Sequence, residues 1–186
     1  MEAMEDLFSV GQEGNSAENL KNAIGRQSEF VDTQSPAKNG ELIHKFLGFH
    51  MGIMGLDLKV GVDRPSMRNS HSISPIQVDL SSFNSKTLVE LKVESLKLLQ
   101  KLLKHTKKSR IFAFWYALLP KCAFNPCKNG ILELINYPDQ VVRETALDLM
   151  MELFQNSTTH LLLANAHCRA GSFTPVCLEF ALALGR

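Results

Sequence analysis

Two segments of the chain repeat each other's pattern of apolar and polar residues. The segment that begins at Leu91, LKVESLKLLQKLL, aligns without a gap with the segment that begins at Val142, VRETALDLMMELF, at an offset of 51 residues. In both, a small residue precedes Leu-x-Leu and a further apolar residue, and an apolar pair closes the segment. Apolar residues at spacings of three and four are typical of a buried helix face. A repeated amphipathic helix predicts an array of helical units that bury their apolar faces against one another.

The residues around this repeat predict four helices. Residues 86–104 form the first, with an apolar face opposite a stripe of Glu and Lys. The members of that face are Leu88, Leu91, Ser95, Leu98, Leu99 and Leu102. Ser109 is a suitable N-cap for a second helix, which has to end at Pro120. A brief third helix is predicted at ILELIN, and Pro138-Asp139 begins the fourth, which continues to Gln155.

The fourth predicted helix is apolar around most of its circumference. On a helical wheel, a narrow polar stripe is left for Glu144, Asp148, Glu152 and Gln155. A helix in a repeat array is buried by its own partner and by both neighbouring units, so a wide apolar arc is expected. Arg143 falls inside that arc. Its guanidinium must find carbonyl or Asp partners in a neighbouring turn, or else extend its tip into solvent.

Residues 137–153 resemble the second helix of a HEAT repeat, which is commonly written Asp-Pro-Asp-x-x-Val-Arg-x-x-Ala-Leu. The matching residues are Pro138, Asp139, Val142, Arg143, Ala146 and Leu147. Tyr137 stands where the family has its first Asp, which departs from the Asp–Arg hydrogen bonds between successive HEAT turns. The resemblance implies an all-α, HEAT/armadillo-like α-α superhelix of about two repeats. Leu98 and Leu149 are expected at equivalent central positions of the two repeated helices.

A longer stretch, roughly residues 85–166, is similar to the HEAT repeat-containing protein six family. KKSRIFAFWYALLP, LINYPDQVVRETALDLMMELFQNST and LANA follow one another in that family's order. Trp115 lies in the most telling segment, an aromatic-Trp-x-Ala-apolar-x-Pro run that ends at Pro120. The resemblance implies an α-solenoid whose biochemistry is poorly understood, with no active site to carry over.

Residues 1–84 are expected to be mostly disordered. Residues 9–40 are rich in Gly, Ser, Asn and Gln, so they bury too little apolar surface to offset the entropy lost on ordering. An apolar island follows at residues 42–60, where Gly48, Gly52 and Gly55 argue against a long helix. The island is either a segment that orders on a partner, a strand pair, or an unstructured apolar patch.

The repeat register is lost after residue 167, and residues 168–186 are expected to form an atypical tail. About three repeats are usually needed for a stable array. We therefore expect a shortened form of a longer solenoid, with a self-associating or marginally stable chain as the consequence. The alternative is a capping helix over residues 177–184.

The chemistry-bearing residues do not predict an enzyme or a cofactor. The six histidines are scattered, without an acid or a Cys nucleophile at a recognisable spacing, and no glycine-rich phosphate loop occurs. Cys122 and Cys127 lack a second pair at zinc-ligand spacing, so no metal site is predicted. The acidic N-terminus is not a secretory signal, and the longest apolar run has nine residues, too few to cross a bilayer. We expect an intracellular protein, cytoplasmic or nuclear, without membrane contact.

Two functions remain open. The first is a protein–protein interaction scaffold whose concave helix face binds a partner. The second follows from an uneven charge distribution beneath a net charge of only +1, because residues 84–128 carry ten Lys or Arg and two Glu. A basic turn could bind nucleic acid or an acidic protein, although a charge run between helices is most often a solvated turn. The candidate residues of this patch are Lys101, Lys104, Lys107, Lys108 and Arg110.

Overall fold

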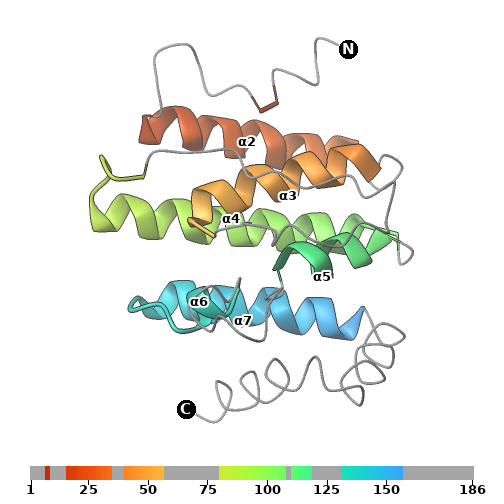
Figure 1. Ribbon diagram of the computed structural model, residues 1–186. Helices are drawn as coiled ribbons and strands as arrows, with labels where there is room; N and C mark the ends of the chain where they lie inside the picture. The colour runs from red at the N-terminus through yellow and green to blue at the C-terminus, as the bar shows by residue number, and fades with distance from the viewer. Residues whose placement is uncertain are drawn as a thin grey trace, which may run out of the picture.

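The regular structure of the chain is helical. The computed structural model describes residues 7–8, 16–34, 40–56, 80–107, 110–118 and 131–156, and these residues include no β-strand. Trp115 lies on a described helix, but its side chain is outside the described part. The helices are α2 (Ala17–Thr33), α3 (Gly40–Met54), α4 (Ser85–His105), α5 (Phe112–Leu118), α6 (Leu132–Ile135) and α7 (Gln140–Gln155) (Figure 1).

The helices form two layers around α4. In one layer α2, α4 and α7 lie one below the other, with α4 in contact with both of the others (Figure 1). In the second layer α3 packs against α4 and against α5, while the short α6 packs against α7. The central position of α4 explains why so much of its circumference is apolar.

Side-chain caps set where the long helices begin. Asp139 Oδ1 accepts hydrogen bonds from the backbone N–H groups of Val141 at 2.9 Å and Val142 at 3.2 Å. Asn84 Oδ1 accepts from Thr87 N–H at 2.8 Å. Such caps satisfy donors that the first helical turn leaves without intrahelical partners. The predicted start of the fourth helix at Pro138-Asp139 is confirmed.

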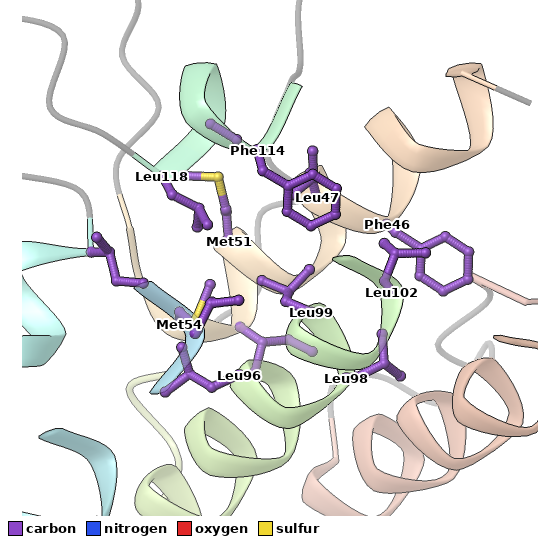
Figure 2. Packing of buried hydrophobic residues seen from close by; sticks show 14 of the residues in the cluster. Phe46, Leu47, Met51, Met54, Leu96, Leu98, Leu99, Leu102, Phe114 and Leu118 are labelled. Carbon is purple, nitrogen blue, oxygen red and sulfur yellow. The ribbon is translucent and has the colours of Figure 1, made fainter. Parts of the chain in front are cut away.

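A continuous apolar core joins the two layers. Figure 2 shows α3 and α5 side chains directed toward the buried leucines of α4. The residues labelled there are Phe46, Leu47, Met51 and Met54 of α3, Leu96, Leu98, Leu99 and Leu102 of α4, and Phe114 and Leu118 of α5. The packing explains why α5, only seven residues long, is stable, because an isolated helix of that length is not.

The repeat found in the sequence corresponds to equivalent burial in α4 and α7. Five positions spaced along one face of α4 are buried, and so are their five counterparts at an offset of 51 residues. They are Leu91, Ser95, Leu98, Leu99 and Leu102 in α4, and Val142, Ala146, Leu149, Met150 and Leu153 in α7. The two helices therefore present the same face to the interior.

The expectation that residues 1–84 are mostly disordered is wrong over α2 and α3. The apolar residues of α2 are few, but they recur at helical spacing and are buried together in the common core. The residues buried from α2 are Leu20, Ala23, Ile24, Gln27 and Val31. Tertiary burial of one face stabilises a helix whose composition alone does not favour it. Residues 57–79 and 168–186, which carry the linker and the tail of the prediction, lie outside the described residues.

The expectation that glycines prevent a helix in the apolar island is also wrong. Gly48 and Gly52 lie within α3, where each costs about 1 kcal/mol relative to Ala. Burial of large side chains such as Phe46 and Phe49, both fully buried, offsets that cost. Gly55 alone acts as the expected breaker, because its φ of 71° lies in the left-handed region just after α3 ends.

Two Gly→Ala substitutions should have opposite effects on stability. Gly55→Ala forces a Cβ into left-handed backbone and should destabilise the chain by about 1 kcal/mol. Gly25→Ala, in the middle of α2 with open space around the new Cβ, should stabilise it by about 0.5–1 kcal/mol. Urea denaturation of both variants checks the assignment, and a stabilising Gly55→Ala would contradict the described end of α3.

Candidate interaction surface

The first residue of the predicted basic patch, Lys101, joins two helices. Its Nζ donates a hydrogen bond to Ser28 Oγ at 3.0 Å and forms an ion pair with Asp32, both on α2. A second ion pair between the same helices, Lys21 Nζ to Glu90 Oε2 at 2.5 Å, lies nearer the start of α4. These contacts set the register of α2 on α4 and occupy the Lys101 ammonium.

The other patch residues are directed to different neighbours. Lys104 Nζ lies 3.5 Å from Glu152 Oε2 of α7, on the side of α4 away from α2. The Arg110 guanidinium lies against the start of α3, where a Cβ on Gly40 would be only 2.0 Å from Nη1. Lys107 is exposed and Lys108 lies outside the described residues. Lys101, Lys104 and Arg110 are therefore near one another in sequence but lie against three different helices, α2, α7 and α3.

A buried lysine that the sequence reading overlooked lies at the junction of α3, α4 and α6. Lys92 is only 7% exposed, and its Nζ donates a hydrogen bond to the carbonyl of Met54, the last residue of α3. The ammonium also lies 5.4 Å from the centre of the Tyr137 ring, within range of a cation–π interaction. Burial lowers the pKa of Lys92, and the Glu133 carboxylate acts in the opposite direction.

Arg143 is the repeat counterpart of Lys92, and it also donates to backbone carbonyls outside its own helix. Its Nη1 donates to the carbonyls of Tyr137 at 2.9 Å and Pro138 at 2.7 Å, in the turn that precedes α7. The half-buried guanidinium is therefore satisfied by backbone oxygens of its own turn. The signal was present in the sequence, because the repeat alignment places one basic residue over the other.

Tyr137 contacts both basic residues. Its ring faces the ammonium of Lys92 in α4, and its carbonyl accepts a hydrogen bond from Arg143 in α7. A chain of polar contacts thus runs from Met54 through Lys92, Tyr137 and Arg143. We name these four residues the Lys92–Arg143 ladder. It fixes the turn before α7 against the end of α3 and the middle of α4.

Removal of the Arg143 hydrogen bonds from the Lys92–Arg143 ladder should lower the free energy of unfolding by a measurable amount. Arg143→Met keeps most of the apolar stem and removes both hydrogen bonds, so we expect a loss of about 1–2 kcal/mol of unfolding free energy. Gln155→Met introduces the same side chain at an exposed position of α7 and should change stability by less than about 0.5 kcal/mol. Equal urea midpoints for both variants would mean that the Arg143 hydrogen bonds contribute nothing to stability.

The exposed side of α7, its free face, has one exposed apolar side chain toward each end and acidic side chains between them. Val141 and Met151 are 52% and 43% exposed, and they are the exposed large apolar side chains among the described residues. Glu144 and Asp148 lie between them on the same exposed side. The remaining predicted repeat positions are internal, with Val142, Ala146 and Leu149 buried and Asp139 serving as the N-cap. Pro138 is exposed in the turn.

The described part of the chain has neither a metal-binding cluster nor a membrane-spanning helix. No group of three or more His, Cys, Asp or Glu side chains there is arranged to hold a metal ion. Cys122 and Cys127 lie outside the described residues. None of the helices α2 to α7 is both long and apolar enough to cross a membrane.

Residues 90–186, more than half of the chain, match a family described as a domain of unknown function (DUF4042). The chain belongs to the DUF4042 family. No curated protein and no solved structure matches it. The DUF4042 match begins within α4 and includes Lys92, Tyr137 and Arg143, whereas α2 and α3 precede it. The match also extends through residues 168–186, the predicted atypical tail.

Proposed function

We propose that this DUF4042 protein is a HEAT-like α-solenoid that acts as a non-catalytic protein–protein interaction scaffold. The Lys92–Arg143 ladder carries the proposal. Lys92 and Arg143 occupy equivalent positions of a 51-residue repeat, and each donates to backbone carbonyls outside its own helix. Such equivalence is expected of stacked copies of one structural unit.

The helix order supports the same arrangement. In a solenoid of paired helices, the second helices of successive pairs stack in one layer and the first helices in the other. The contacts fit this order, with α2, α4 and α7 in one layer and α3 and α5 in the other. Tyr137 stands where HEAT repeats commonly have an Asp. We propose that its ring binds the Lys92 ammonium of the preceding unit in place of the Asp–Arg hydrogen bond of HEAT repeats.

The proposed partner is another protein, bound inside the cell in the cytoplasm or nucleus. Solenoids bind partners over extended layer faces, and α7 offers such a face with two exposed apolar side chains among acids. Binding of nucleic acid through the basic turn is less favoured, because Lys101 and Lys104 already pair with acids of α2 and α7. We propose that the chain is functionally similar to the HEAT repeat-containing protein six family, which its sequence resembles.

Surface variants of the full chain test the scaffold proposal. Val141→Glu/Met151→Glu introduces two Glu residues on the free face of α7. Asn22→Glu/Thr33→Glu introduces two Glu residues at exposed positions of α2 as a control. We expect the wild type and the α2 variant to retain the same stoichiometric protein partner in affinity purification, and the α7 variant to lose it. Retention by all three proteins would contradict binding through α7, and absence of any stoichiometric partner would contradict the scaffold.

A further inference from the structure

Two residues near the N-terminus lie on the surface made by α2 and α3 without belonging to any helix. Leu7 is buried, and the Phe8 ring meets Phe46 and Phe49 edge-on, with centroids 5.2 Å and 5.9 Å apart. Both partner rings of α3 are fully buried. Aromatic pairs in this geometry are favourable beyond the area that they bury. The Leu7–Phe8 pair therefore covers an aromatic surface that would otherwise meet water.

A buried polar pair beneath these residues binds the backbone of the same segment. Gln27 Nε2 donates to the carbonyl of Leu7 at 2.9 Å, and Gln27 Oε1 lies 2.8 Å from His50 Nε2. Because a carbonyl can only accept, the Gln27 amide nitrogen must face Leu7, and its oxygen must accept from His50 Nε2–H. Gln27 and His50 are both fully buried, so this orientation is held without help from solvent.

These contacts define what the surface requires of an occupant. Removal of the Leu7 carbonyl would leave a buried N–H of Gln27 without its acceptor, which proteins avoid. Removal of Phe8 would uncover Phe46 and Phe49. The surface therefore recognises a backbone carbonyl through Gln27 and an aromatic side chain through Phe46 and Phe49, and the adjacent Leu7 is buried as well. A main-chain hydrogen bond combined with burial of neighbouring side chains is typical of peptide recognition.

We propose that the surface formed by Gln27, Phe46, Phe49 and His50 is a docking site for a short segment with adjacent Leu and Phe, and that the chain's own Leu7–Phe8 occupies it in cis. The seated segment itself identifies the occupant. The inference goes beyond the scaffold proposal, because α2 and α3 precede the DUF4042 match and the site does not involve the free face of α7.

The small number of contacts leads us to expect that the occupancy in cis is reversible. The segment contributes two described side chains and one hydrogen bond, and residues 9–15 tether it to the start of α2. A short tether gives an effective concentration on the order of mM. A competing peptide supplied at micromolar concentration should therefore bind poorly until the tethered segment is removed from the site.

Fluorescence anisotropy with a labelled peptide of residues 1–12 tests the proposal on the full chain. The opened variant Leu7→Ser/Phe8→Ser keeps the tether and removes the side chains that fill the site. We expect it to bind the peptide at least about tenfold more tightly than the wild type does. A peptide with the same two Ser substitutions is the matched control and should not bind. Cooperative melting of the opened variant verifies that it is folded.

The other outcomes overturn the proposal. Failure of the folded, opened variant to bind the peptide would show that the surface is not a docking site. Equal affinity of wild type and opened variant would place peptide binding elsewhere. If the opened variant loses its cooperative melt, Leu7 and Phe8 are part of the permanent core and the reversible site is refuted. A wild-type dimer that the peptide converts to monomer would assign the segment to a second copy and refute occupancy in cis.

Discussion

Leu149→Asp is expected to unfold the protein at room temperature, so that no cooperative thermal transition remains, and Leu98→Asp should do the same. Both leucines are buried at equivalent positions, Leu98 in α4 and Leu149 in α7. Truncation of a buried leucine costs about 2–5 kcal/mol, and a carboxylate placed there adds a desolvation penalty. Together these effects approach the whole stability of a typical domain, about 5–15 kcal/mol.

A matched control separates burial from the introduction of charge. Met151→Asp places the same carboxylate on the same helix at an exposed position, and it should cost less than about 1 kcal/mol. Circular dichroism during thermal unfolding checks all three variants. A melting temperature for Leu149→Asp close to that of Met151→Asp would contradict the packing of α7 against α4 and with it the repeat register.

Acidification should destabilise the protein through His50. Burial lowers the pKa of His50 to about 3, from an ordinary value near 6.5. The neighbours that its ring contacts, Gln27, Phe46 and Phe49, are neutral and supply no compensating charge. Below pH 6.5 the unfolded chain binds a proton at His50 while the folded chain does not. The unfolding free energy should therefore fall as the pH falls, by about 2 kcal/mol between pH 7 and pH 5 from this group.

Replacement of His50 isolates its share of the pH dependence. His50→Gln keeps a hydrogen-bonding group next to Gln27 and removes the titration, so its stability should fall less steeply below pH 6.5. Urea denaturation at pH 5, 6 and 7 gives the slopes. Identical slopes for wild type and His50→Gln would show that the imidazole binds a proton as readily in the folded chain as in the unfolded chain.

The parts of the fold that the sequence predicted are those where local signals agree. The first repeated helix has a clear apolar face, and α7 has both that pattern and an Asp cap directly after Pro138. Equivalent burial of Leu98 and Leu149 follows from the repeat alone. These features depend on residues within a turn or two of one another, so a single sequence contains them.

The parts that were missed depend on contacts between distant segments. Nothing local indicates that α2 packs on α4, because Lys101 and its partner Asp32 are far apart in the chain. Gly48 and Gly52 of α3 argue against a helix until the burial of Phe46 and Phe49 is known. The sequence gives no local sign that the Lys92 ammonium binds the carbonyl of Met54, because the two residues are far apart in the chain. The contacts of Lys101, Lys104 and Arg110 with three different helices are likewise not visible in the sequence.

Zero-length cross-linking tests the layer order, and with it the proposed solenoid, most directly. A carbodiimide joins an ammonium to a carboxylate only where they are in contact, and the ion pairs provide such contacts between helices. We expect mass spectrometry of the monomer to find Lys21–Glu90 and Lys101–Asp32 links between α2 and α4, and a Lys104–Glu152 link between α4 and α7. Links from Lys21 of α2 to Glu144, Asp148 or Glu152 of α7 within the monomer would place α2 beside α7 and contradict the stack.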